Sequence, residues 1–155
     1  MNYTHTLVFI RYQDEFLLIN REKGSWFGCW NGLGGKVKKN ESSLDCALRE
    51  TKEETGLELE TLSFCGSFSW SNEDDPNDRG LIACYHGFSK EYLKTPLKYR
   101  EGILDWKKTS WILNPNNQGI AKNIPLFINR ILEGKVFKYH CSYRGLKLLD
   151  IKDAT

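Results

Sequence analysis

Apolar and polar positions along the first part of the chain follow the pattern of β-strands. The segment THTLVFIRY, at 4–12, is rich in β-branched and aromatic residues, which favours a strand. The polar QDE that follows favours a turn, so FLLINR at 16–21 is expected to return as the second arm of a hairpin. For the same reason LSFCGSFSW at 62–70 and GLIACYHGF at 80–88 predict two further strands, separated by a polar stretch.

Between these two pairs of strands, at about 43–55, the apolar positions recur with the spacing of a helix, and we expect one face of that helix to be largely buried. The positions on this face are Leu44, Ala47, Leu48, Thr51 and Thr55. Ser42 or Ser43 is expected to cap the N-terminus, with Asp45 completing a motif that resembles a capping box. Gly56 is expected to end the helix in the left-handed conformation.

The rest of the chain predicts more strands and a second helix. LKYREGILDWKKTSWIL at 97–113 is ambiguous and is interpreted as a strand followed by a short turn. GIAKNIPLFINRIL at 119–132 has helical periodicity, with Pro125 tolerable near its first turn. KVFKYHCSYRGLKLLDIK at 135–152 predicts a closing hairpin. Strands interrupted by two helices favour one mixed α+β domain over residues 1–155.

Composition narrows the class of protein. The chain is 40% hydrophobic and 27% charged, with a net charge of +2, which is ordinary for a globular protein and disfavours a nucleic-acid polymer as partner. The first residues lack a signal-peptide pattern, and no apolar run approaches the ~20 residues that span a bilayer. Five cysteines without paired ligand spacing are expected to be free thiols. We therefore expect a cytoplasmic protein that does not bind membranes.

Three glutamates stand close together on the predicted central helix. At about 100° per residue, Glu50, Glu53 and Glu54 occupy one arc beside the buried face, while Arg49 and Lys52 lie on other sides. Such a set is either a solvated charged face or a cation site. The glycine-rich WNGLGGKV at 30–37 precedes the helix, and Mg²⁺ prefers carboxylate and carbonyl oxygens, which supports the cation site.

At this point the chain resembles the Nudix hydrolases. Gly35 is followed by KVKKN, Glu41, SSLDCAL and then RETKEETGL, which matches the family signature at every glycine and charged position. Thr51 occupies a position of the signature that is usually aliphatic. This difference is expected to affect the packing of the core more than the chemistry of the site. LLINR, WNGLGGKV, the EG before LDW, and GLKLLD are similar to the MutT-type branch of this family.

The resemblance implies a Nudix fold, an α/β/α sandwich in which a mixed β-sheet lies between α-helices. It also implies Mg²⁺-dependent hydrolysis, with Mn²⁺ as a substitute, of nucleoside triphosphates to a monophosphate and pyrophosphate. Oxidised purines such as 8-oxo-dGTP are the expected substrates, which would make the protein a sanitiser of the nucleotide pool. The partner would be a small nucleotide and the protein a monomer or homodimer. Another nucleotide substrate, such as a nucleotide sugar, and a sensor without hydrolysis are the alternatives.

The same resemblance assigns roles to individual residues. The implied metal ligands are Gly35, Glu50, Glu53, Glu54 and Glu101. Glu53 or Glu54 would orient or deprotonate the attacking water, Arg49 would hold a helix glutamate, and Glu41 would be structural. The implied substrate-binding residues are Arg21, Asn31, Lys36 and Asn123. From the residues alone, Asn123 is better interpreted as an N-terminal helix cap, and Glu101 is equally a surface loop residue. Trp26, Phe27 and Trp30 would stack on a base or pack the loop.

Overall fold

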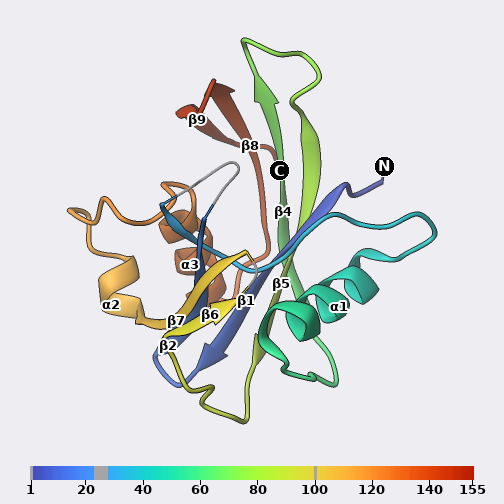
Figure 1. The fold of residues 1–155 in the computed structure, drawn as a ribbon. Coiled ribbons are helices and arrows are strands. Elements are labelled where there is room, and N and C mark those ends of the chain that lie inside the picture. The colour runs from blue at the N-terminus through green and yellow to red at the C-terminus, as the bar shows by residue number, and fades with distance from the viewer. Residues whose placement is uncertain (1, 23–27, 100) are drawn as a thin grey trace.

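A computed structural model describes residues 2–22, 28–99 and 101–155. The questions raised for Trp26 and Phe27 lie outside these residues. One mixed sheet with the strand order β6-β7-β2-β1-β5-β4-β8-β9 forms the centre of the molecule, and β3 pairs with β2 beside this path (Figure 1). The strands are β1 His5–Tyr12, β2 Glu15–Arg21, β3 Trp30–Asn31, β4 Ser63–Asn72, β5 Gly80–Phe88, β6 Leu97–Tyr99, β7 Gly102–Lys108, β8 Phe137–Arg144 and β9 Lys147–Asp153.

Strand β1 lies in the middle of the sheet and contributes to a core on each face. It pairs antiparallel with β2 and parallel with β5. Successive side chains of a strand point to opposite faces. Accordingly Leu7 and Phe9 join one apolar cluster, and Val8 and Ile10 join the other. The unbroken apolar run TLVFI is therefore the sequence of a strand buried on both faces.

Helices cover both faces of this sheet, which confirms the expected sandwich (Figure 1). Helix α1, Ser43–Thr55, supplies Ala47 to the cluster of Val8 and Ile10. Helix α3, Ile124–Leu132, supplies Phe127 to the cluster of Leu7 and Phe9. The short helix α2, Thr109–Ile112, occupies the end of the segment for which a turn was expected. None of the helices in the described part of the chain is long and apolar enough to cross a membrane.

The ends of α1 are those expected from the sequence. The Ser42 side chain accepts a hydrogen bond from the Asp45 backbone N–H at 3.0 Å, and Gly56 adopts a φ of 77° beyond the last turn. The expected buried face is correct for Ala47, Thr51 and Thr55. Leu44 and Leu48 are only half-buried, because they pack at the edge of the cluster.

The C-terminal hairpin extends the far side of the sheet. Strand β8 pairs parallel with β4, and β9 follows β8 through a turn at Gly145. The predicted free thiols are also confirmed, since all five cysteines are unpaired in the structure. The sheet thus brings the loop before α1, the β4–β5 loop and the C-terminal hairpin around one end of β1, where a pocket opens.

Candidate active site

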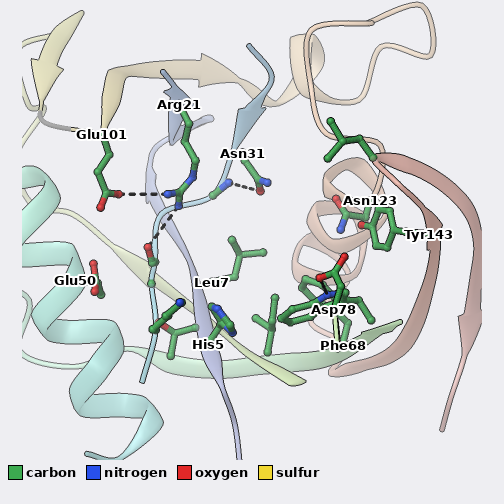
Figure 2. Close-up of a pocket in the computed structure, with 18 of the residues that line it drawn as sticks. His5, Leu7, Arg21, Asn31, Glu50, Phe68, Asp78, Glu101, Asn123 and Tyr143 are labelled. Atoms are coloured by element: carbon green, nitrogen blue, oxygen red, sulfur yellow. Dashed lines mark hydrogen bonds and ion pairs between the residues drawn. The ribbon is translucent and has the colours of Figure 1, made fainter. Parts of the chain in front are cut away.

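A pocket of about 520 Å³ lies beside the start of β1. Two sets of polar groups mark its opposite ends (Figure 2). Glu50, Arg21 and Glu101 lie at one end, which we call the acidic end. Asn123 and Tyr143 lie at the other, which we call the amide end. Elements distant in the sequence build each end, so the pocket exists only in the folded chain.

At the acidic end, Glu54 is buried behind the glycine loop with only 2% of its surface exposed. Its Oε1 accepts a hydrogen bond from the Gly34 backbone N–H at 3.1 Å, while Oε2 has no hydrogen-bond partner among the described residues. Burial raises the pKa of Glu54 to about 8, against the lowering influence of Arg21 and the Gly34 N–H. The carboxyls of Glu101 and Glu50 raise this pKa further. A buried carboxyl in this setting binds a proton or another cation readily.

Arg21 links the strands to the glycine loop beside Glu54. Its Nη1 forms an ion pair with Glu101 Oε2 at 3.3 Å, and its Nη2 donates to the Gly34 carbonyl at 3.4 Å. Strands β2 and β7 pair so that Arg21 stands opposite Gly102, which brings Glu101 to this end of the pocket. Glu101 is therefore part of the acidic end and does not lie on an unrelated surface loop.

Arg49 is the centre of an ion-pair network on the outer side of the acidic end. It donates two hydrogen bonds to Glu41, at 2.7 and 3.0 Å, and one each to Glu50 at 2.9 Å and Glu53 at 3.2 Å. The Arg49 guanidinium lowers the pKa of Glu41 to about 2. Arg49 starts from another side of the helix, and its long side chain folds back across Glu50 and Glu53. Among the described residues it pairs with these two helix glutamates and not with Glu54. The expected pairing of Arg49 with a helix glutamate is present.

The glycine at position 35 permits a close approach of the loop to α1. A Cβ built on Gly35 would lie 2.4 Å from Glu50 Oε1, so a side chain there would displace the carboxylate. The Gly35 carbonyl accepts a hydrogen bond from the Thr6 backbone N–H at 2.9 Å, which ties the loop to β1. The Cys46 Sγ also lies 3.9 Å from this oxygen, as a long and weak donor.

The expectation that Glu50, Glu53 and Glu54 form one neighbouring set is only partly correct. Glu54 is buried behind the loop, whereas the Glu53 side chain is 44% exposed and paired with Arg49. No group of three histidine, cysteine or acidic side chains in residues 2–22, 28–99 and 101–155 is arranged as a metal cluster. The unpartnered buried oxygen of Glu54, close to two further carboxyls, nevertheless suits a hard divalent cation.

At the amide end, Asn123 is 4% exposed, and its Oδ1 is buried without a hydrogen-bond partner among the described residues. Asn123 occupies the N-cap position of α3 but makes no side-chain capping bond, so its interpretation as a helix cap is wrong. The amide instead lines the pocket. Because the buried side-chain amide of Asn123 does not cap the helix, its oxygen is available to accept a hydrogen bond from a ligand.

Other predicted substrate residues lie along the same pocket. Asn31 lines it, although its Oδ1 already accepts a hydrogen bond from the Gly32 backbone N–H at 2.7 Å. Lys36 lines the pocket on its exposed side. Trp30 packs against the apolar cluster that contains Phe127 of α3. The Nζ of Lys107 lies 4.3 Å from the centroid of the Trp30 ring. The Trp30 side chain therefore has a packing role.

The pocket also contains residues that the sequence did not indicate. Among them are His5, Trp70, Asp78 and Tyr143. They belong to β1, β4, the β4–β5 loop and β8, and no short motif contains any two of them. The only signal available was the position of His5 and Trp70 on predicted strands, which does not reveal the face to which a side chain points.

Comparisons with known proteins identify the family of the chain. A family model described as the NUDIX domain matches residues 2–113. The chain is 34% identical to the oxidized purine nucleoside triphosphate hydrolase of Mus musculus over 66% of this chain and 64% of that protein. It is 30% identical to the mRNA-decapping protein g5R of African swine fever virus, over 84% of this chain and 55% of that protein. The matched stretches thus span less than two thirds of both relatives.

Solved structures support the fold alone. A MutT protein from Bacillus halodurans superposes with a TM-score of 0.81 over 97% of both chains, at 22% sequence identity. The NUDIX domain of Shewanella oneidensis NrtR, solved with ADP ribose, superposes with a TM-score of 0.66 over 86% of this chain, at 15% identity. The α3, β8 and β9 segments, which follow the family-model match, are therefore also part of a recurrent architecture.

Proposed function

The chain belongs to the Nudix family, and from that premise we propose that it is a hydrolase that converts nucleoside triphosphates to a monophosphate and pyrophosphate. We take oxidised purine nucleotides such as 8-oxo-dGTP as its substrates. The observation that carries this proposal is one pocket with a buried, unpartnered carboxyl oxygen of Glu54 near one end and a buried, unpartnered amide oxygen of Asn123 at the other. A nucleotide has the matching polarity, with phosphates at one end and a base at the other.

The acidic end would hold the polyphosphate through a divalent cation. In this proposal Glu50, Glu53, Glu54, Glu101 and the Gly35 carbonyl hold Mg²⁺ or Mn²⁺. The bound metal would screen the phosphate charge and favour displacement by water. Arg49 would position Glu50 and Glu53 through the hydrogen bonds that it donates to both.

The chain's own residues would then orient the reacting groups. Arg21 and Lys36 border the pocket and would hold the outer phosphates by charge. Glu53 or Glu54 would orient the attacking water or accept its proton. The raised pKa of Glu54 suits a group that exchanges a proton near neutral pH.

The amide end would read the base. Asn123 presents an amide, which can both donate and accept, so it can distinguish a 6-oxo purine edge from a 6-amino one. Asn31 would contact the nucleoside between the two ends. Phe68 and Leu7 supply apolar surface in the same pocket for the face of the base.

A second substrate class is supported by the 30% identity to a protein named for mRNA decapping, which extends over 84% of this chain. A capped RNA also contains a nucleotide joined through phosphates. This candidate contradicts the expectation that no nucleic-acid polymer binds, so a direct comparison of substrates decides between the two.

The test is a substrate panel assayed with Mg²⁺ for release of monophosphate and pyrophosphate. The panel contains 8-oxo-dGTP, dGTP, dATP, a nucleotide sugar and a capped RNA. We expect 8-oxo-dGTP to be the best substrate and Glu54→Gln to lower kcat by at least about 100-fold, as loss of a group that moves a proton does. Glu58→Gln is the matched control, because Glu58 is exposed at the end of α1 and pairs only with Lys52 among the described residues.

The outcomes separate the possibilities. If no triphosphate is hydrolysed, or if Glu54→Gln equals the parent, the proposed reaction is wrong. If the capped RNA or the nucleotide sugar is hydrolysed far faster than 8-oxo-dGTP, the metal site stands and the substrate assignment fails.

A further inference from the structure

We propose that Asp78 is a specificity residue that selects bases with two adjacent hydrogen-bond donors on one edge, as guanine has. This inference rests on the proposed function, since it concerns the base of the same nucleotide. Asp78 belongs to the β4–β5 loop, outside the signature that defines the acidic end. It lines the pocket together with Asn123 and Tyr143 (Figure 2).

The Asp78 carboxylate is held in place by two side chains of β4. Oδ1 accepts a hydrogen bond from Trp70 Nε1 at 2.9 Å, and Oδ2 accepts one from Asn72 Nδ2 at 2.8 Å. Trp70 is itself a wall of the pocket. Because a carboxylate offers about four lone-pair positions, each oxygen can accept one more bond. Asp78 is exposed at the rim of the pocket, where these two bonds orient its carboxylate and leave each oxygen able to accept another.

The loop that carries Asp78 is joined to the C-terminal hairpin. Asn72 Nδ2 also donates to the Gly145 carbonyl at 3.0 Å, and the Gly145 N–H donates to Asn72 Oδ1 at 3.2 Å. Arg144 pairs with Glu73 in the same region, at 2.8 Å. These bonds fix the position of the Asp78 loop relative to β8, which carries Tyr143, and so define the shape of the amide end.

The charge of Asp78 indicates which part of the nucleotide it meets. Within the described residues, no lysine or arginine forms an ion pair with Asp78, so its negative charge is not neutralised by a cation. A polyphosphate would be repelled there. Asp78 lies at the amide end, away from Arg21 and Glu101, so it faces the base (Figure 2).

Two groups at the amide end can therefore accept hydrogen bonds. Asn123 Oδ1 is buried without a partner among the described residues, and the Asp78 carboxylate has open lone pairs. The edge of guanine that carries N1–H and the 2-amino group offers adjacent donors, whereas adenine places one donor beside an acceptor. An acceptor facing an acceptor is unfavourable and excludes the wrong base. The 8-oxo group lies on the other ring and leaves the donor edge unchanged.

The experiment measures binding, so it does not require hydrolysis. Isothermal titration would give the affinities of dGMP, dIMP and dAMP for the full chain, its Asp78→Asn variant and an Asp74→Asn control. dIMP lacks only the 2-amino group of dGMP. Asp74 lies in the same loop, and the substitution changes the charge equally, but Asp74 does not line the pocket among the described residues.

In the parent and in Asp74→Asn, dGMP should bind roughly 10- to 100-fold more tightly than dIMP, as expected for a hydrogen bond to a charged group. Asp78→Asn should bring this ratio close to one while leaving dAMP binding no weaker, which also shows that the variant is folded. An unchanged ratio in Asp78→Asn, equal binding of dGMP and dIMP by the parent, or no binding of any nucleotide would each overturn the inference. The expected binding pattern without any hydrolysis would overturn the proposed function alone.

Discussion

At the scale of single residues, Glu54 and Asn123 differ from the other polar side chains around them. Both are almost fully buried, and each has one oxygen without a hydrogen-bond partner among the described residues. Leaving a buried acceptor unpaired costs about 1–3 kcal/mol. A protein tolerates this cost where a ligand supplies the missing partner. Asn123 lines the pocket, and Glu54 lies behind Gly34, which lines it too.

The buried carboxyl of Glu54 predicts a pH-dependent stability in metal-free buffer. Its pKa is raised from 4.5 to about 8, so its neutral form is favoured in the folded state. The stability that it contributes is fully present below pH 4.5 and is lost as the pH rises through about 8. Relative to Glu54→Gln, the parent's free energy of unfolding should fall over this range by up to about 1.4 kcal/mol per pH unit.

Urea unfolding at a series of pH values, with a chelator present, measures this difference. Glu60→Gln, which alters an exposed glutamate, should follow the parent at every pH. If the curves of the parent and Glu54→Gln stay parallel from pH 4.5 to 8, the carboxyl does not carry the raised pKa described above.

Asn123→Ala should affect base recognition and leave metal dependence unchanged. Loss of the amide removes a base contact, so KM for the preferred purine triphosphate should rise about tenfold or the preference between purines should relax. Steady-state kinetics over a range of Mg²⁺ concentrations measures both properties. Asn129→Ala on the exposed side of α3 is the control. A change in the Mg²⁺ requirement of Asn123→Ala would mean that Asn123 has been assigned to the wrong end of the pocket.

At the scale of elements, helix α1 is positioned by its ends as well as by its buried face. The Ser42 cap and the left-handed Gly56 fix where the helix begins and ends. This sets the rotation of the helix, so that Glu54 points behind the glycine loop while Glu53 points to solvent. A capped helix therefore determines which carboxyl is buried.

Gly56→Ala should test this dependence on the helix end. Gly56 has a φ of +77°, and a Cβ there would meet no atom within 4 Å, so the cost is conformational. We expect a loss of about 1 kcal/mol in the free energy of unfolding, measured by urea titration. Gly56→Asn should lose less, because asparagine tolerates this conformation better than alanine. Equal losses for the two variants would point to a steric cause.

At the scale of the whole molecule, the sheet joins two apolar cores and the two ends of the pocket. The family-model match ends at residue 113, yet Asn123 and Tyr143 of the amide end come from the segment that follows. That segment also supplies Phe127, whose ring stacks on Phe137 with 4.7 Å between centroids and lies tilted against Phe68 at 4.9 Å. We propose that residues 1–155 form a single domain, because these rings tie the C-terminal segment to β4.

Phe127→Ala should destabilise the entire chain by about 3–5 kcal/mol, as deletion of a fully buried aromatic ring does. Because the two cores share one sheet, tryptophan fluorescence and far-ultraviolet circular dichroism should report the same single transition. Leu132→Ala is the control, since Leu132 is 38% exposed, and should cost far less. Separate transitions by the two probes would show that the C-terminal segment folds independently.

The sequence by itself determined the local features of this protein. The strands, the limits of α1, its caps and the family signature all depend on residues near one another in the chain, where spacing and backbone preference suffice. It also predicted a set of site residues. Of these, Arg21, Asn31, Gly35, Lys36, Glu50, Glu101 and Asn123 line one pocket, whereas Arg49, Glu53 and Glu54 are not among the residues that line it.

Only the tertiary structure decided which of these groups are buried, which are paired and what else surrounds them. Burial of Glu54, exposure of Glu53 and the use of Arg49 by three carboxylates depend on how α1 packs against a loop and a strand. His5, Trp70, Asp78 and Tyr143 meet through pairings between strands far apart in the sequence. The environment of a side chain, and hence its pKa and its free lone pairs, arises from such long-range packing, which local sequence patterns do not encode.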